Sequence, residues 1–121
     1  MARDFKKIIA WELSHKFTLE VYKSTKNFPK EESYGVTSQL RRAAVSVPTN
    51  IAEGATRNSN KEYLQFLYIA KGSLAEAEYL IFLSQSLGYL NDSEYQELNK
   101  KCQECAKTLY GLMMSVRENN N

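Results

Sequence analysis

The stretch YQELNKKCQECAKTLYGLMMSV, residues 95–116, decides the fold class of this chain. Its apolar residues recur at alternating spacings of three and four, at Tyr95, Leu98, Cys102, Cys105, Leu109, Leu112 and Val116. This heptad-type repeat places them on one side of an α-helix and is typical of near-parallel helix packing. The sequence therefore predicts a helix over 92–117, capped by Asn91 or Asp92, that packs lengthwise against other helices.

The preceding segment, 60–87, carries a similar seam. Its members are Tyr63, Leu67, Ala70, Leu74, Ala77 and Ile81. Ser59 followed by Glu62 fits a capping box at the start of this helix. Gly88 is a natural stop at its end, because glycine readily adopts the left-handed conformation that terminates helices.

Two more helical segments complete the chain. The segment 34–57 places one apolar face at spacings of four, four, three and four, through Val36, Leu40, Ala44, Val47 and Ile51. The segment 5–27 ends before Phe28-Pro29, because a residue that precedes proline is disfavoured in the helical region. Pro48 lies inside the second helix, where it removes one hydrogen bond and crowds the preceding turn. We expect a kink there, because the apolar phase continues past it.

No segment shows a convincing strand pattern, and the connections between the helices are short. Short connections between long helices favour antiparallel neighbours. The sequence therefore predicts an all-α, single-domain protein over 1–121: an antiparallel up-down-up-down four-helix bundle with its second helix kinked at Pro48.

The third helix has more apolar surface than one seam requires. One additional stripe consists of Phe66, Ile69, Leu80, Leu83 and Leu87, and another includes Tyr68, Ala75, Tyr79 and Phe82, with Gly72 allowing close approach. Large exposed apolar patches usually mark contacts, so we expect a subunit interface at Tyr68, Gly72, Ala75, Tyr79 and Phe82. Scattered exposed aromatic residues on a monomer are the alternative.

Composition narrows the class of protein. The chain has 121 residues, with 43% apolar and 25% charged, which is typical of a folded soluble domain. Charged residues interrupt any early signal peptide, and the densest apolar stretch, 79–83, is far too short to span a membrane. Two cysteines without a secretion signal suggest the reducing cytoplasm. We therefore expect a cytoplasmic protein without a membrane partner.

Motifs for catalysis or metal binding are weak. Glu12-Leu13-Ser14-His15 has the spacing of di-iron carboxylate bundles, but such sites need two of these motifs and His15 is the only histidine. Cys102 and Cys105 lie mid-helix on the seam, so we expect buried, structural cysteines. Phosphate-binding loops and activated nucleophiles are not evident. We expect no enzyme, no metal and no cofactor.

Positive charge is concentrated in the first half. The net charge is +2, but residues 1–61 carry 11 Lys and Arg against 6 Asp and Glu, whereas residues 62–121 carry 5 against 8. The candidate phosphate contacts are Arg41, Arg42, Arg57 and Lys61, with the lysines of the first helix and its exit (Lys6, Lys7, Lys16, Lys23, Lys26 and Lys30). A solvated helix face is the alternative interpretation. Because no aromatic-interleaved motif is visible, we expect contacts to backbone and shape rather than to bases.

The stretch YGVTSQLRRAAVSVPTNIAEG, residues 34–54, closely resembles the signature of the 23S rRNA-intervening-sequence proteins, also called the four-helix-bundle protein family. Matches continue on both sides, at Trp11, His15, Phe28-Pro29, Arg57, Phe66-Leu67, Gly72-Ser73 and Leu109-Tyr110-Gly111-Leu112. The resemblance implies a small bundle that assembles into homopentamers and associates with RNA. A related branch resembles the accessory protein of diversity-generating retroelements, which implies the alternative of a protein-interaction scaffold.

The matching stretch also has a physical interpretation. Arg41 and Arg42 can contact phosphate or an acidic group on a neighbouring subunit. Asn50 and Glu53 can satisfy backbone groups freed at Pro48, or bond across an interface. The small residues Ala43, Ala44, Ser46, Ala52 and Gly54 permit close helix approach. Binding and assembly both remain open as roles for this stretch.

Overall fold

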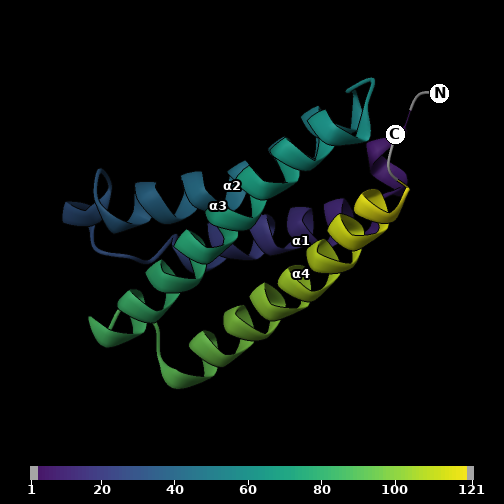
Figure 1. The fold of residues 1–121 in the computed structure, drawn as a ribbon. Helices are drawn as coiled ribbons and strands as arrows, with labels where there is room; N and C mark the ends of the chain where they lie inside the picture. Colours follow the sequence, from purple (N-terminus) through teal and green to yellow (C-terminus); the bar gives the residue numbers. More distant parts are fainter. Residues whose placement is uncertain (1–2, 120–121) are drawn as a thin grey trace.

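A computed structural model describes residues 3–119 (Figure 1). Its helices are α1 (Ile9–Ser24), α2 (Val36–Ala55), α3 (Asn60–Ser86) and α4 (Asp92–Glu118), with short 3-10 turns at Phe5–Lys7 and Lys30–Glu32. The described residues contain no strand, so the all-α prediction is confirmed. None of their helices combines the length and the apolarity that crossing a membrane would require.

The four helices form a closed ring of neighbours. Each packs against the next in sequence and α4 packs against α1, while the diagonal pairs, α1 with α3 and α2 with α4, do not approach each other. Neighbouring helices run in opposite directions, as Figure 1 shows. The four-helix bundle is therefore confirmed. The 3-10 turn at Phe5–Lys7, the end of α4 and the α2–α3 turn lie at the same end of the bundle, called here the terminal end.

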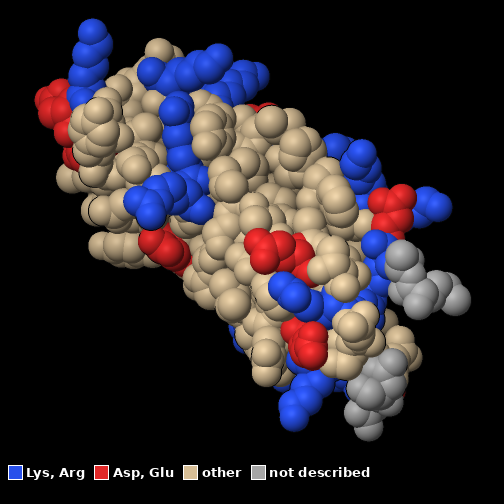
Figure 2. Space-filling view, turned by 90° about the horizontal axis from the view of Figure 1, so that it is seen from above, with Lys and Arg blue, Asp and Glu red and all other residues tan. Residues whose placement is uncertain are grey.

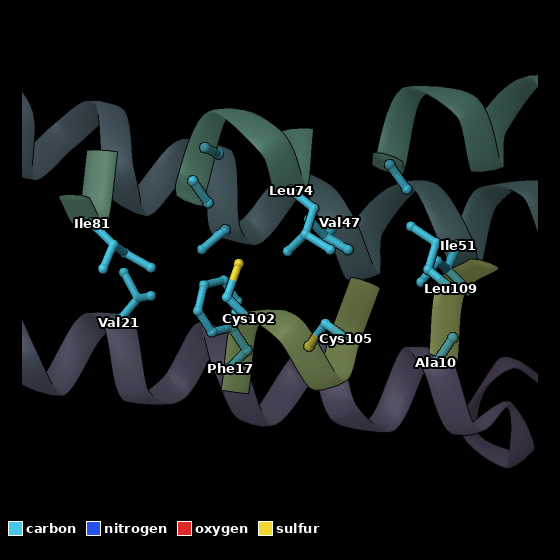
Figure 3. Close-up of a cluster of buried hydrophobic side chains, with 14 of the residues drawn as sticks. Ala10, Phe17, Val21, Val47, Ile51, Leu74, Ile81, Cys102, Cys105 and Leu109 are labelled. Carbon is cyan, nitrogen blue, oxygen red and sulfur yellow. The ribbon is translucent and has the colours of Figure 1, made fainter. Parts of the chain in front are cut away.

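The core is built from all four helices, and it includes most of the seams predicted for α2, α3 and α4 (Figure 3). The α3 seam is buried throughout, and the apolar face of α2 is buried as well. On α4 the prediction fails at two positions: Tyr95 is only partly buried, and Met113 is buried in place of Leu112. A straight helix drifts by ~20° per heptad relative to a strict seven-residue repeat, which shifts the buried face along a long helix.

The predicted first helix, 5–27, is too long at both ends. Asp4 accepts a hydrogen bond from the Lys6 backbone N–H and closes a separate 3-10 turn, and Ile8 is extended before α1 begins. At the other end, the Thr25 hydroxyl donates to the Val21 carbonyl oxygen at 2.8 Å, and the chain turns immediately. Side chains that bond the local backbone commonly compete with helix at such positions.

The second helix begins at Val36 rather than at Tyr34, because Glu32 caps it. Glu32 Oε1 accepts from the Val36 backbone N–H at 3.2 Å, and the Tyr89 hydroxyl donates to Oε2 at 2.7 Å. A Cβ atom at Gly35 would lie 2.5 Å from Glu32 Oε1, so the glycine makes room for this carboxylate. The α1–α2 loop is thereby tied to the α3–α4 loop.

The helix α2 continues through Pro48 without a break, as the predicted apolar phase requires; the kink stays a prediction. Proline has no N–H to donate to the carbonyl four residues earlier, which is that of Ala44. Thr18 on α1 supplies the donor instead, since its hydroxyl lies 3.1 Å from the Ala44 oxygen. Asn50 and Glu53 were expected to satisfy backbone groups freed at Pro48. Asn50 donates to the Ser46 carbonyl oxygen at 2.8 Å, and Glu53 is exposed.

The ends of α3 and α4 follow the sequence signals closely. Ser59 Oγ accepts from the Glu62 N–H at 3.2 Å, and Asn91 with Glu94 forms a complete capping box. Gly88 has a φ of 83°, which only glycine adopts without strain. The backbone N–H of Tyr89 bonds back to the Ser84 oxygen at 2.8 Å, which completes a Schellman stop.

Candidate functional site

The predicted phosphate contact Arg41 is engaged within the bundle. Its Nε donates to Thr25 Oγ1 at 2.8 Å, its Nη2 donates to the Tyr22 carbonyl oxygen at 3.3 Å, and its guanidinium lies 4.6 Å from the Tyr22 ring centroid. A cation beside the last carbonyls of a helix also interacts favourably with the helix dipole. Arg41 therefore joins the start of α2 to the end of α1, and two of its three nitrogens donate within the bundle.

The neighbouring Arg42 points outward and has no hydrogen bond or ion pair within residues 3–119. It lines a polar groove of about 390 Å³ between α2 and α3, together with Gln39, Ala43, Ser46, Ser73 and Glu76. The Ser46 and Ser73 hydroxyls lie 2.8 Å apart across this groove. Arg42 is thus the member of the Arg41-Arg42 pair that is available to a partner.

Arg57 and Lys61 lie at the terminal end, around the turn from α2 to α3. The Arg57 guanidinium rests over the Phe66 ring, 4.5 Å from its centroid, and donates no hydrogen bond within the described chain. Lys61 is exposed and forms no ion pair there. Both cations are free to meet an external anion.

The four predicted phosphate contacts do not form one patch. Arg42 lies in the first half of α2 and Arg57 follows its end, which at 1.5 Å per residue is ~20 Å further along the helix. Figure 2 shows that the positive side chains on the face seen there lie in several separate places, with acidic side chains and uncharged surface between them. The structure therefore separates the predicted site into two places, one at each end of α2.

Arg3, which sequence reasoning did not select, organises the terminal end. Its Nη1 donates to the carbonyl oxygens of Arg57 at 2.9 Å and Ala55 at 3.3 Å, and its Nη2 donates to Asn60 Oδ1 at 2.7 Å. Its guanidinium also lies 4.4 Å from the Tyr63 ring centroid. The only sequence signal was an early arginine, and its partners lie more than fifty positions away.

The predicted oligomer interface forms one outward stripe on α3, opposite the core. Tyr68, Tyr79 and Phe82 are 43%, 59% and 54% exposed, and Gly72 and Ala75 are exposed between them. A Cβ atom at Gly72 would meet no atom within 4 Å, so the bundle itself does not require this glycine. Exposed apolar stripes of this kind are typical contact surfaces.

An apolar pocket of about 180 Å³ borders this stripe between α3 and α4. It is lined by Lys71, Leu74, Ala75, Glu78, Ala106, Leu109, Tyr110 and Met113. Tyr110 is 62% exposed at its edge. The apolar surface of α3 therefore continues toward α4.

Cys102 and Cys105 are buried in the core, as predicted, and His15 packs on α1. Burial raises the pKa of each thiol to about 12, so both stay protonated at neutral pH. His15 stacks on Trp11 with an interplanar angle of 7°. Within residues 3–119, no group of three or more His, Cys, Asp and Glu residues is arranged to hold a metal ion.

The small residues of the stretch 34–54 include one with a clear packing role. A Cβ atom at Gly54 would lie 2.8 Å from Phe66 Cβ and 2.9 Å from Tyr63 Cδ1. The glycine therefore permits the close contact of α2 with α3, as predicted.

Comparison with known proteins identifies a family and a similar fold. The family described as 23S rRNA-intervening sequence protein matches residues 6–111. A crystal structure of a protein of unknown function from the S23 ribosomal protein family of Bacteroides thetaiotaomicron superposes with a TM-score of 0.78. That pair is 23% identical in sequence, and the match covers 87% of this chain and 98% of the other. No curated protein matches this chain in sequence.

Proposed function

This chain belongs to the 23S rRNA-intervening sequence protein family, and from that membership we propose that it is a non-enzymatic, homo-oligomeric bundle that associates with RNA. The observation that carries the RNA proposal is the set of exposed cations without intramolecular ion pairs, which includes Arg42, Arg57 and Lys61. Phosphate groups bind such cations and release counterions on doing so.

Assembly is the second part of the proposal. The outward stripe of α3 supports it, because three large aromatic side chains there are about half exposed with small residues between them. A ring of copies would repeat each basic surface, which offsets the modest net charge of +2 per chain. Five copies is the number that the family resemblance implies.

The absence of catalysis is supported by the chemistry of the candidate nucleophiles. Both thiols are buried in the core, and their pKa values of about 12 leave almost no thiolate at neutral pH. The thiolate is the reactive form of cysteine. His15 lies on Trp11 and has no carboxylate within salt-bridge distance in the described chain.

RNA association is tested by salt-titrated fluorescence anisotropy with a short labelled RNA of mixed sequence. The logarithm of the affinity should fall linearly with the logarithm of the salt concentration. Replacing Arg57 and Lys61 together by Gln should reduce that slope by roughly 0.7 for each lost phosphate contact. The matched control replaces Lys100 and Lys107, which are exposed on α4, and should leave the slope unchanged. Absence of binding at low salt would end the RNA proposal.

Assembly is tested by light scattering of the purified chain, which should give the mass of five copies. Tyr79→Glu should dissociate the oligomer, because it places a charge in the centre of the apolar stripe. Leu19→Glu is the control, since Leu19 is similarly exposed on α1, away from the stripe. A monomeric wild-type chain would contradict the interface.

A protein-interaction scaffold is the second candidate, and the apolar pocket beside Ala75 and Tyr110 favours it. Apolar grooves with a charged edge, here Lys71 and Glu78, are typical of sites for partner helices. If RNA binding fails while Tyr110→Ala removes a protein partner from a pull-down, this candidate replaces the first.

A further inference from the structure

At the start of α3, three aromatic rings each carry an arginine from a different part of the chain. The arginines come from the N-terminal segment, from the α2–α3 turn and from the end of α4. We call them the arginine collar. The distances from guanidinium carbon to ring centroid are 4.4 Å for Arg3 and Tyr63, 4.5 Å for Arg57 and Phe66, and 5.7 Å for Arg117 and Tyr68.

The members of the collar differ in how many donors remain available. Arg3 uses three hydrogen bonds to hold the α2–α3 turn. Arg117 donates to the Tyr68 hydroxyl. Arg57 is exposed, rests over the Phe66 ring and donates no hydrogen bond within residues 3–119, so its donors remain available. Arg57 is therefore the member best placed to receive a ligand.

Further cations surround the collar at the terminal end. Lys6 and Lys7 lie on the 3-10 turn that follows Arg3 in the chain, and Lys61 lies in the first turn of α3. In the described chain the only ion pairs are Glu12–Lys16 and Glu97–Lys101, so none of these lysines is neutralised by a salt bridge. At this end, the Arg57 guanidinium rests on a ring and the exposed side chains of Lys6, Lys7 and Lys61 add further positive charge.

We propose that the collar binds single-stranded RNA, with an unstacked base lying on the guanidinium plane of Arg57 and the neighbouring phosphates contacting Lys6, Lys7 and Lys61. This inference rests on the RNA association proposed above and names the form of RNA. Bases of single strands stack on arginine planes and aromatic rings in many RNA-binding proteins. A duplex hides its base faces, so it offers only phosphates to the same surface.

The described chain has one other arginine–aromatic pair, Arg41 with Tyr22, and this arginine is bonded within the bundle, unlike Arg57. Arg41 lies over Tyr22 at the opposite end of the bundle, but two of its nitrogens donate to α1 and its side chain is half-buried. Its plane is held against α1, so it is not offered to a ligand. The arrangement at Arg57 is therefore particular to the terminal end.

The test compares Arg57→Lys with Lys107→Arg in anisotropy titrations against a single-stranded RNA. Both variants keep the charge, but only Arg57→Lys removes a planar guanidinium that rests on a ring. Arg57→Lys should weaken binding about ten-fold, from the loss of one stacked base, with the salt slope unchanged. Lys107→Arg, on the exposed surface of α4 outside the collar, should bind like the wild type. Light scattering and thermal unfolding of each variant confirm that assembly and fold are retained.

A spectroscopic readout isolates stacking from charge. With 2-aminopurine in the RNA, wild-type binding should quench the fluorescence, because stacking quenches this base, and Arg57→Lys should abolish the quenching at saturating protein. If the wild type binds RNA with the expected salt slope but Arg57→Lys matches it, or duplex RNA competes as well as the single strand, the collar proposal is overturned and RNA association stands. If the wild type binds no RNA at low salt, both proposals fail.

Discussion

Thr18 Oγ1 on α1 lies 3.1 Å from the carbonyl oxygen of Ala44 on α2 and donates to it, sharing its proton with the Ser14 oxygen at 2.8 Å. Ala44 lies four residues before Pro48, so its carbonyl has no backbone donor within the helix. The proline in α2 is therefore accommodated by a hydroxyl on a neighbouring helix.

Replacing Thr18 by Val should lower the free energy of unfolding by about 1–3 kcal/mol, because the buried Ala44 oxygen would lose its donor. Chemical denaturation measures the change. The double variant with Pro48→Ala is the control, because alanine restores a backbone N–H for Ala44. Thr18→Val should then cost clearly less in the Pro48→Ala background, and equal costs in the two backgrounds would refute the coupling.

Gly54→Ala should destabilise the bundle by about 1–3 kcal/mol, because the new methyl group would overlap Phe66 Cβ and Tyr63 Cδ1. Gly111→Ala is the matched control in α4, since a Cβ atom there meets no atom within 4 Å. That variant should gain about 0.5–1 kcal/mol from helix propensity alone. Thermal unfolding that ranks the two variants in the opposite order would contradict the packing.

The link between Glu32 and Tyr89 should make stability depend on pH at both extremes. The Tyr89 hydroxyl and the Val36 N–H lower the pKa of the Glu32 carboxyl below its ordinary 4.5. Its contribution is therefore present above pH 4.5 and is lost as the pH falls through the lowered value. The bond to Glu32 raises the pKa of Tyr89 above 10.0, so that contribution is present below pH 10.0 and is lost as the pH rises through the raised value.

Tyr89→Phe should remove this bond, so the stability difference from the wild type should be largest between those two pH values. Urea titrations at a series of pH values measure it. A difference that stays constant from acid to alkaline pH would show that the hydroxyl acts through packing alone.

Cys102 and Cys105 should resist alkylation in the native protein. Their raised pKa of about 12 leaves both thiols protonated at pH 8, and the reagent reacts with the thiolate. Mass spectrometry after iodoacetamide treatment should show modification only once denaturant unfolds the chain. Rapid labelling of the folded protein would mean that the α4 seam opens.

Much of the fold could be predicted from local signals. Gly88 ended α3 and Asn91 began α4 because their preferences depend on the backbone of a few neighbouring residues. The same logic failed at Leu112, where the drift of a straight helix moved burial to Met113, and at Tyr34, where the Glu32 carboxylate fixed the start of α2.

The candidate site was less predictable, because charge in a sequence does not say where a side chain's partners are. Arg41 and Arg42 are adjacent, yet one is bonded to α1 and the other faces a groove. The ring under Arg57 belongs to Phe66, only nine positions further along the chain. Arg3 meets the distant Tyr63 only because antiparallel packing brings the start of α3 next to the first described residues.

The sequence by itself determined four helices, their order and most of the buried seam residues of the last three, because apolar periodicity and caps act over a turn or two of backbone. Only the tertiary structure decided which cations are free and which rings they cover. Among those contacts, Arg3 meets partners more than fifty positions away, because the closed ring of helices brings the first described residues to the α2–α3 turn.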